Sequence, residues 1–293
     1  MNRVHPVVLV LVAIASVQFG ASLAKGAFDL AHPATLAFLR GAIASVVFIA
    51  IAPPRLSGRS RRDWVVAAGY GACLAGMNAL IYLSFARIPV GLAVTLEFVG
   101  PLALGVLGSR RAVDLLWVAL AAVGVVLLGA GPTAHDPVGI ALALGAGALW
   151  AAYIALAGPL GRRWKGATGL TVGSAFGVVL LAGPGLALAG GAWRDPRVLG
   201  VMAMVALLST VIPYGLELHA RRSISAGTFG VLMSLEPAAA ALFAWLVLGE
   251  WLRPLEWLAM AAVIAASAGA IRTAATRRAR GQITVGNTRV EGA

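Results

Sequence analysis

Four ionisable side chains lie inside runs of the sequence that are otherwise apolar: Arg40, Glu97, Glu217 and Glu236. Glu97 is the one charge in the stretch GLAVTLEFVGPLALG, residues 91–105. An ionisable group in lipid is costly, so such residues usually face the interior of a helical bundle or a water-filled cavity. A carboxylate placed there can bind a cationic group of a substrate or carry a proton. The sequence therefore predicts a polar site for binding or transport within an apolar molecule.

Uncharged polar side chains in the same runs extend this candidate site. The strongest candidates are Gln18, Asn78, Tyr82, Tyr153 and Tyr214. Asn78 and Tyr82 are four residues apart, so on a helix they share one face. Tyr214 and Glu217 are three apart and share a face in the same way. Pro213 precedes this second pair and could free backbone groups within that helix. For Tyr153, simple helix packing is the alternative role.

Each charged candidate also has a structural interpretation. Burial of an unpaired arginine is prohibitive, so Arg40 is expected to pair with a carboxylate, with contact to a substrate as the alternative. Glu217 is expected to face headgroups or to pair with Arg221, four residues on. Glu236 comes directly before a proline, where it could serve either a kinked backbone or a substrate. Glu97 has no cation three or four residues away on its own helix, which makes it the strongest functional candidate.

The sequence contains no other reactive constellation. It has no glycine-rich phosphate loop, no His or Cys spacing typical of metal sites, and no nucleophile with a matching His and acid. Cys73 is the single cysteine, which excludes an intramolecular disulfide. We therefore expect no cofactor and no metal, and an enzyme is the weaker class of function.

The composition requires a bilayer around the elements that position these residues. Of the 293 residues, 60% are hydrophobic and 12% are charged, whereas about a quarter are charged in soluble domains. The net charge of +12 does not indicate a nucleic-acid partner, because the basic residues form short clusters between apolar runs. Backbone in lipid must satisfy its own hydrogen bonds, and the runs lack the alternation of barrel strands. We predict an all-α integral membrane protein with ten transmembrane helices at residues 6–24, 33–52, 64–85, 89–108, 115–130, 138–157, 168–188, 198–219, 226–248 and 255–271.

The distribution of lysine and arginine predicts the orientation in the membrane. With a cytoplasmic N-terminus, the gaps that face the cytoplasm hold Arg55, Arg59, Arg61, Arg62, Arg110, Arg111, Arg162, Arg163, Lys165, Arg221 and Arg222. The opposite gaps hold only Lys25, Arg87, Arg194, Arg197 and Arg253. Both termini are therefore expected in the cytoplasm, with a disordered polar tail at 273–293. The first run resembles a signal peptide, but Gln18 interrupts it and further runs follow, so a retained helix is predicted.

The fourth and fifth apolar runs resemble the ninth and tenth. VGLAVTLEFVGP aligns with AGTFGVLMSLEP, which pairs Pro101 with Pro237. This repeat predicts two halves of five helices, residues 1–131 and 132–272, and because five is odd the second half would cross the membrane inverted. Inverted repeats are typical of secondary transporters, whose binding site lies near the midplane between the halves. The glutamates of the two aligned segments are offset by three residues, about one helical turn.

Several segments carry a resemblance to a known family. They include SVQFGASLAK in the first run, GMNALIYLS in the third, VTLEFVGPLA in the fourth, STVIPYGLEL in the eighth and GVLMSLEPA in the ninth. In this order they resemble the EamA-type branch of the drug/metabolite transporter superfamily, and within it the bacterial threonine/homoserine exporters. The sequence departs from the expected pattern at Phe19 and Val99, where a smaller and a more polar residue are expected. These departures bear on the substrate and not on the fold.

The resemblance implies two inverted five-helix repeats around a central cavity lined by the first, third, fourth, sixth, eighth and ninth helices. It implies export of small amino acids across the bacterial inner membrane by alternating access, coupled to proton entry. Glu97 would meet the α-ammonium group or carry the proton, and Arg40 or Asn78 would meet the carboxylate. The expected site comprises Glu97, Gln18, Asn78, Tyr82, Tyr153, Tyr214, Glu236 and Arg40.

Two other functions remain open at this point. On the same scaffold the chain could export a drug, a nucleoside or another small metabolite. From a different class, it could be a membrane scaffold or sensor without transport, which a sealed midplane with all four charges paired would favour.

Overall fold

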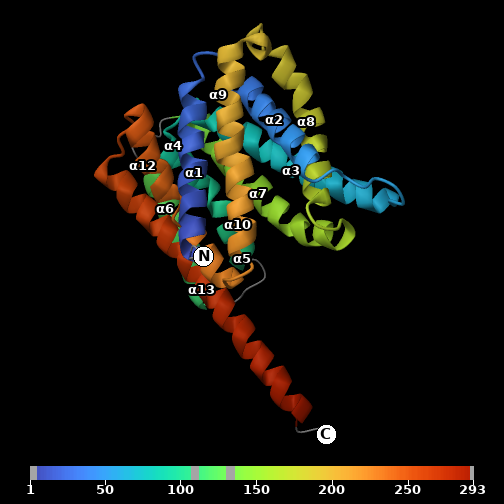
Figure 1. The fold of residues 1–293 in the computed structure, drawn as a ribbon. Helices are drawn as coiled ribbons and strands as arrows, with labels where there is room; N and C mark the ends of the chain where they lie inside the picture. The colour runs from blue at the N-terminus through green and yellow to red at the C-terminus, as the bar shows by residue number, and fades with distance from the viewer. Residues whose placement is uncertain (1–4, 107–111, 130–135, 291–293) are drawn as a thin grey trace.

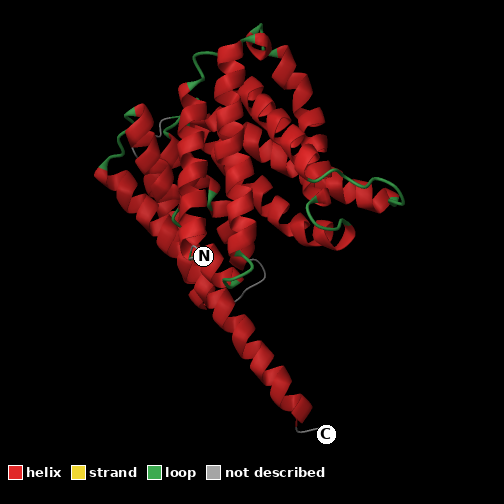
Figure 2. Cartoon of the chain, in the orientation of Figure 1, coloured by secondary structure: helices red, strands yellow, loops and turns green. Residues whose placement is uncertain are grey.

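The computed structural model describes residues 5–106, 112–129 and 136–290. Within these ranges every regular element is helical (Figure 2), which confirms the all-helical prediction. Eight helical segments are long and apolar enough to cross a membrane, and two shorter apolar ones lie at Val90–Val106 and Val113–Leu127. Their order along the chain matches the ten predicted apolar runs.

The helices of the first half are α1 (Pro6–Gly26), α2 (Pro33–Ile51), α3 (Arg61–Phe85), α4 (Val90–Glu97), α5 (Val99–Val106) and α6 (Ala112–Gly129). Those of the second half are α7 (Pro137–Arg163), α8 (Thr168–Ala187), η1 (Ala192–Arg194), α9 (Pro196–Ala206), η2 (Leu207–Val211), α10 (Ile212–Ala220), α11 (Ala226–Met233), α12 (Glu236–Leu248) and α13 (Pro254–Val290). Some predictions lie outside the described residues, namely the run ends at 108 and 130, the boundary between the halves at 131, and Arg110 with Arg111.

Helix starts follow from capping residues that the sequence supplies. At the start of α3, Ser60 and Asp63 form a capping box in which each side chain accepts from the backbone N–H of the other. Asp136 caps α7, which has a proline in its first turn. The N–H of Gly139 and the guanidinium of Arg87, 2.8 Å away, hold the pKa of Asp136 below its usual value.

Prolines divide three of the apolar runs into shorter helices. Pro101 has no N–H for the carbonyl of Glu97, four residues earlier, and the fourth run breaks there between α4 and α5. Pro237 stands in the same relation to Met233, and the ninth run breaks between α11 and α12. In the eighth run the π-helical turn η2 ends two residues before Pro213. Each broken run carries one of the predicted carboxylates.

The C-terminal helix extends beyond the predicted tenth run. In the structure α13 reaches Val290 and projects away from the bundle (Figure 1), while the prediction of a disordered cytoplasmic tail at 273–293 stays a prediction. No proline follows Pro254, and the segment begins with alanines and arginines, which favour a helix.

Small residues bring helix backbones together across the bundle. A Cβ on Gly71 of α3 would lie 2.0 Å from the carbonyl oxygen of Gly173 on α8. A Cβ on Gly91 would lie 2.8 Å from Ala241, where α4 crosses α12. In lipid, helices associate largely through such close packing. In this way α3 packs against α7 and α8, while α1 packs against α10 and α12 (Figure 1).

One end of the bundle is closed by a partly buried ion pair and apolar side chains. The ammonium of Lys25, near the end of α1, lies 2.5 Å from Glu250 in the loop after α12. Lys25 also donates to the carbonyl of Ile88 at 3.0 Å, and Glu250 accepts from the N–H of Val90 at 2.8 Å. The pair therefore fastens α1 and α12 to the start of α4. Beneath it, Phe85, Ile88 and Val90 are at most 2% exposed.

Candidate functional site

All eight predicted site residues line one cavity of about 500 Å³. This volume lies in the range of roughly 300–1,000 Å³ that is typical of small-molecule sites. The residues come from both halves of the chain: Gln18 on α1, Arg40 on α2, Asn78 and Tyr82 on α3, Glu97 on α4, Tyr153 on α7, Tyr214 on α10 and Glu236 on α12. Side chains separated by up to 218 residues in sequence thus meet at one space.

Three carboxylates line the cavity, and two of them, Glu97 and Glu236, are buried, whereas Glu217 lies beside Arg221. Glu236 is 7% exposed, and its Oε2 accepts a hydrogen bond from Nε2 of Gln18 at 3.4 Å. The Oε1 of Gln18 is buried and has no partner among the described residues. Glu97 is 8% exposed and belongs to none of the ion pairs in the described part of the chain. These groups therefore keep hydrogen-bonding capacity for a molecule in the cavity.

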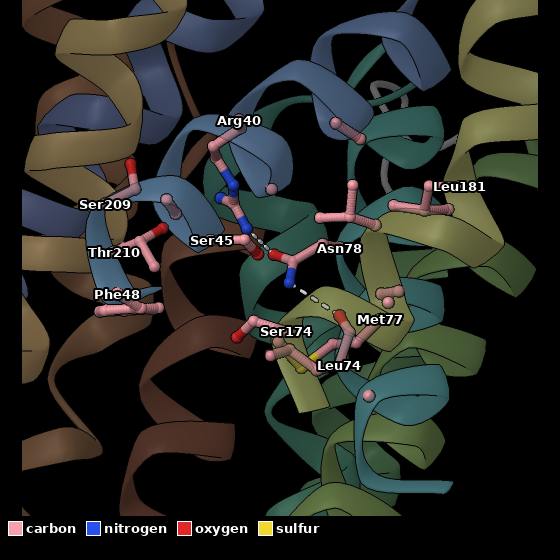
Figure 3. Close-up of a pocket in the computed structure, with 17 residues that line it drawn as sticks. Arg40, Ser45, Phe48, Leu74, Met77, Asn78, Ser174, Leu181, Ser209 and Thr210 are labelled. Carbon is pink, nitrogen blue, oxygen red and sulfur yellow. Dashed lines mark hydrogen bonds between the residues drawn. The ribbon is translucent and has the colours of Figure 1, made fainter. Parts of the chain in front are cut away.

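Arg40 is held by neutral side chains and not by a carboxylate. Its guanidinium donates to the amide oxygen of Asn78 (Figure 3). The guanidinium donates as well to the hydroxyl of Tyr82 at 3.4 Å. It also lies 5.1 Å from the centre of the Tyr82 ring. The prediction that Arg40 pairs with a carboxylate is therefore wrong, as far as the structure describes the chain. Asn78 and Tyr82, one turn apart on α3, supply the oxygens instead, and the guanidinium keeps donors for an anionic group.

Glu97 is positioned by close packing of the α4–α5 break against α7. A Cβ on Gly147 would lie 2.4 Å from the carbonyl oxygen of Glu97, and a Cβ on Gly100 would lie 1.8 Å from the carbonyl oxygen of Gly147. These two contacts leave no room for any larger residue at either glycine. The Glu97 carboxylate thus lies at a helix break whose position is fixed by contact between backbones. No salt bridge is needed to position it.

The π-helical turn η2 frees a backbone carbonyl and brings two residues with hydroxyl groups to the cavity. The N–H of Ile212 donates to Leu207, five residues earlier, so the carbonyl of Leu208 loses its usual helical donor. That carbonyl accepts instead from the hydroxyl of Ser16 on α1 at 2.6 Å. Ser209 and Thr210 of the same turn line the cavity. These two residues were not predicted, although their place three and four residues before Pro213 is a signal for disturbed backbone.

Aromatic rings form much of the remaining wall. Tyr153 lies 4.7 Å from the ring of Tyr70, and Tyr214 lies 5.8 Å from the ring of Phe48 in an edge contact. Tyr153 therefore lines the cavity and packs between helices at once. The two departures from the family pattern lie elsewhere, since neither Phe19 nor Val99 is among the residues that line the cavity, as far as the chain is described.

The cavity extends towards one end of the bundle. It is lined there by Leu170, the third residue of α8, by Arg221, directly after α10, and by Ile271 of α13. The guanidinium of Arg221 lies 3.6 Å from Glu217, which confirms the predicted pair of these residues. At the opposite end the cavity stops at the closed layer that contains Phe85.

The arrangement suits binding of a small zwitterion. It presents carboxylates from α4 and α12 and a guanidinium from α2 within one partly apolar space. Among the described residues no group of three or more His, Cys, Asp or Glu side chains could hold a metal ion. The chemistry available in the cavity is therefore charge pairing, hydrogen bonding and proton exchange at a carboxylate.

Comparisons with known proteins identify a matching family, similar curated proteins and a similar solved structure. The EamA-like transporter family matches residues 137–272. The threonine/homoserine exporter RhtA of Escherichia coli K12 is 42% identical over 271 residues, which cover 92% of each chain. The protein of the same name from Salmonella typhimurium LT2 is 41% identical over the same share. One solved crystal structure covers 93% of this chain and 98% of its own, with a TM-score of 0.61 and 17% identity, and that likeness concerns the fold alone.

Proposed function

Because this chain belongs to the EamA-like transporter family, we propose that it exports threonine, homoserine and similar small amino acids from the cytoplasm. As a member of this family it is a multi-pass membrane transporter and not an enzyme. The proposed location is the bacterial inner membrane with both termini in the cytoplasm, which the asymmetry of lysine and arginine supports.

One observation carries the choice of an amino acid as substrate: the cavity presents a carboxylate and a guanidinium that are not paired with each other. A zwitterion needs one partner of each sign. Glu97 receives the α-ammonium group or carries the coupling proton, and Arg40 receives the carboxylate beside Asn78 and Tyr82. Glu236 and Gln18 complete the acidic side.

The proposed mechanism is alternating access between two inverted five-helix halves. Pro101 and Pro237 break α4–α5 and α11–α12 at corresponding places, which supports the repeat. The match of the family to residues 137–272 also begins close to the proposed boundary at 131. The distribution of lysine and arginine along the chain supports an orientation in which the open end of the cavity faces the cytoplasm and the Lys25–Glu250 pair lies on the outer side. The structure then corresponds to an inward-facing state that awaits substrate.

The scaffold or sensor alternative is disfavoured by the cavity. That function predicted a sealed midplane with all four charges paired, whereas the cavity measures about 500 Å³ and, in the described part of the chain, Arg40 and Glu97 belong to no ion pair. Export of a drug or nucleoside on the same scaffold remains the second candidate, because the aromatic walls could also hold a flat ring.

Growth under substrate stress tests the proposal. A strain that lacks its own threonine exporters and overexpresses this chain is grown with inhibitory concentrations of threonine, homoserine or a toxic analogue, and separately with cationic dyes and nucleoside analogues. We expect resistance to the amino acids and no change with the dyes or nucleosides. Resistance to dyes or nucleosides alone would support the second candidate and contradict amino-acid export. A membrane immunoblot checks that expression is equal in all cultures.

A further inference from the structure

A smaller pocket of about 160 Å³ lies between α2, α3 and α8 (Figure 3) and adjoins the central cavity. The two spaces share the lining residues Arg40, Phe48, Leu74, Met77, Asn78, Ser209 and Thr210. Arg40 and Asn78 therefore stand where the side pocket joins the cavity. A molecule whose carboxylate lies on Arg40 can direct another part of itself into this branch.

Most of the pocket wall is made of small residues, and helix packing explains only some of them. A Cβ on Gly177 of α8 would lie 2.9 Å from the carbonyl oxygen of Gly71, so the close approach of α3 and α8 requires glycine there. Gly41 of α2 is different. A Cβ at Gly41 would meet only Cγ2 of Val178, at 3.7 Å, which is an ordinary contact. The space beside Gly41 is therefore not a by-product of tight helix packing.

The pocket contains a hydroxyl group without a partner. Ser45 is 5% exposed, and its Oγ has no hydrogen-bond partner among the described residues. A serine in an apolar helix usually donates to the carbonyl four residues earlier, as Ser22 does to Gln18 at 3.0 Å. Ser45 lies beside Arg40 and Asn78 in the close-up, with the hydroxyl of Ser174 on the other side of the pocket (Figure 3). A buried hydroxyl left unpaired is unfavourable, which points to a partner that arrives with a ligand.

We propose that this side pocket binds the side chain of the transported amino acid and selects short side chains that carry a hydroxyl group. The inference rests on the proposed function. The substrate carboxylate lies on Arg40 at the junction, its ammonium group points to the carboxylates of the central cavity, and its side chain enters the branch. Ser45 exchanges a hydrogen bond with the substrate hydroxyl, because a serine hydroxyl can both donate and accept.

This arrangement predicts a definite order of substrates. Threonine and homoserine can form a hydrogen bond with the hydroxyl of Ser45. Valine has a methyl group in place of the threonine hydroxyl, so it leaves the hydroxyl of Ser45 without a partner. A site that is built to bond a hydroxyl rejects the analogue that lacks one.

The test is the ratio of threonine to valine efflux from proteoliposomes, measured for the wild type and for Ser45→Ala. The substitution removes an unpaired hydroxyl, so we expect the thermal unfolding temperature to be unchanged or slightly higher. We expect the threonine/valine ratio to fall by roughly three- to tenfold, mainly through slower threonine efflux, as the loss of one hydrogen bond implies. Gly41→Ala, which narrows the pocket without a clash, is expected to slow homoserine more than serine.

Ser84→Ala is the matched control, because Ser84 is a buried hydroxyl that donates to Gly139 and lines neither space. It is expected to leave the threonine/valine ratio unchanged even if it lowers stability. An unchanged ratio in Ser45→Ala, with normal threonine efflux in the wild type, would overturn the side-pocket inference and leave the proposed function intact. Absence of threonine efflux in the wild type would overturn both.

Discussion

Glu97 combines three properties at one residue. It is buried, it lines the central cavity, and it belongs to none of the ion pairs in the described part of the chain. Burying an unpaired carboxylate inside a membrane protein costs free energy, so such a residue usually binds a substrate or carries a proton. The residue is therefore the first position at which to test whether the cavity transports an amino acid.

Glu97→Gln keeps the size of the side chain and removes its charge. We expect the initial rate of threonine efflux from vesicles to fall by roughly tenfold or more, since a hydrogen bond to a charged group contributes about 1.5–3 kcal/mol. Asp29→Asn makes the same chemical change at an exposed position and is expected to have no effect. Equal rates in Glu97→Gln and the wild type would remove Glu97 from the mechanism.

Arg40→Lys tests the geometry of the basic side of the cavity. Lysine keeps the charge, but it cannot reach both Tyr82 and Asn78 with a planar fork. We expect the KM for threonine to rise by roughly three- to tenfold with a smaller change in maximal rate. A variant with unchanged KM would show that Arg40 serves the bundle and not the substrate.

At the residue scale, the sequence predicted which polar residues meet but not how they pair. Intramembrane polar residues face a shared interior, so Gln18 and Glu236 could be assigned to one site from their types alone. Pairing depends on the rotation of neighbouring helices. For this reason the partners of Arg40 could not be predicted, and they are neutral side chains on α3. The hydroxyl of Ser45 likewise lacks the hydrogen bond to a backbone carbonyl that the hydroxyl of Ser22 makes.

The elements around the cavity owe their shape to proline and glycine. Proline lacks the N–H that would donate a helical hydrogen bond, and this interrupts the helix between α4 and α5 and between α11 and α12. Glycine allows the interrupted helices to pack closely against neighbouring helices. The candidate carboxylates stand at these irregular places, where backbone groups are open to a cavity. Changes at the supporting glycines should therefore affect transport without touching a polar group.

Gly147→Ala is the clearest such change. Its Cβ would lie 2.4 Å from the carbonyl oxygen of Glu97, so α4–α5 or α7 must shift. We expect a loss of stability of about 1–3 kcal/mol, as for other overpacked sites, together with reduced threonine efflux. Gly161→Ala on the same helix has no atom within 4 Å of its Cβ and should leave both quantities nearly unchanged. Thermal unfolding in detergent and vesicle efflux measure the two effects, and equal behaviour of the variants would contradict the packing argument.

At the element scale, hydropathy predicted the helices well because each must span the same apolar thickness. The first run, expected at 6–24, is Pro6–Gly26 in the structure. Pro213 was expected to free backbone groups, and the π-helical turn η2 lies beside it. The tenth run, expected at 255–271, lies within α13 (Pro254–Val290).

The whole molecule has one open and one closed end. The cavity reaches helix ends near Leu170 and Arg221, while Lys25 and Glu250 close the other end. In alternating access the closed layer must open, and the ion pair would then break. In the proposed mechanism the pair contributes to the energy difference between the two states, which a substitution can shift.

Lys25→Met should favour the outward-open state. A partly buried pair of this kind contributes about 1 kcal/mol, which corresponds to a roughly fivefold change in population. We expect faster labelling of a cysteine at Ala21, in a Cys73→Ser background, by an impermeant maleimide added outside intact cells. The exchanged pair Lys25→Glu with Glu250→Lys should partly restore the slow rate. Unchanged labelling in Lys25→Met would contradict the role of the pair in closure.

The most direct test of the central claim is efflux of labelled threonine from proteoliposomes that contain only this purified chain. With an inward proton gradient, we predict efflux well above that of protein-free vesicles, reduced by Glu97→Gln and by collapse of the gradient, and competed by homoserine but not by leucine. Efflux no faster than from protein-free vesicles, in a preparation whose folding is verified by its thermal transition, would contradict the claim that this cavity exports small amino acids.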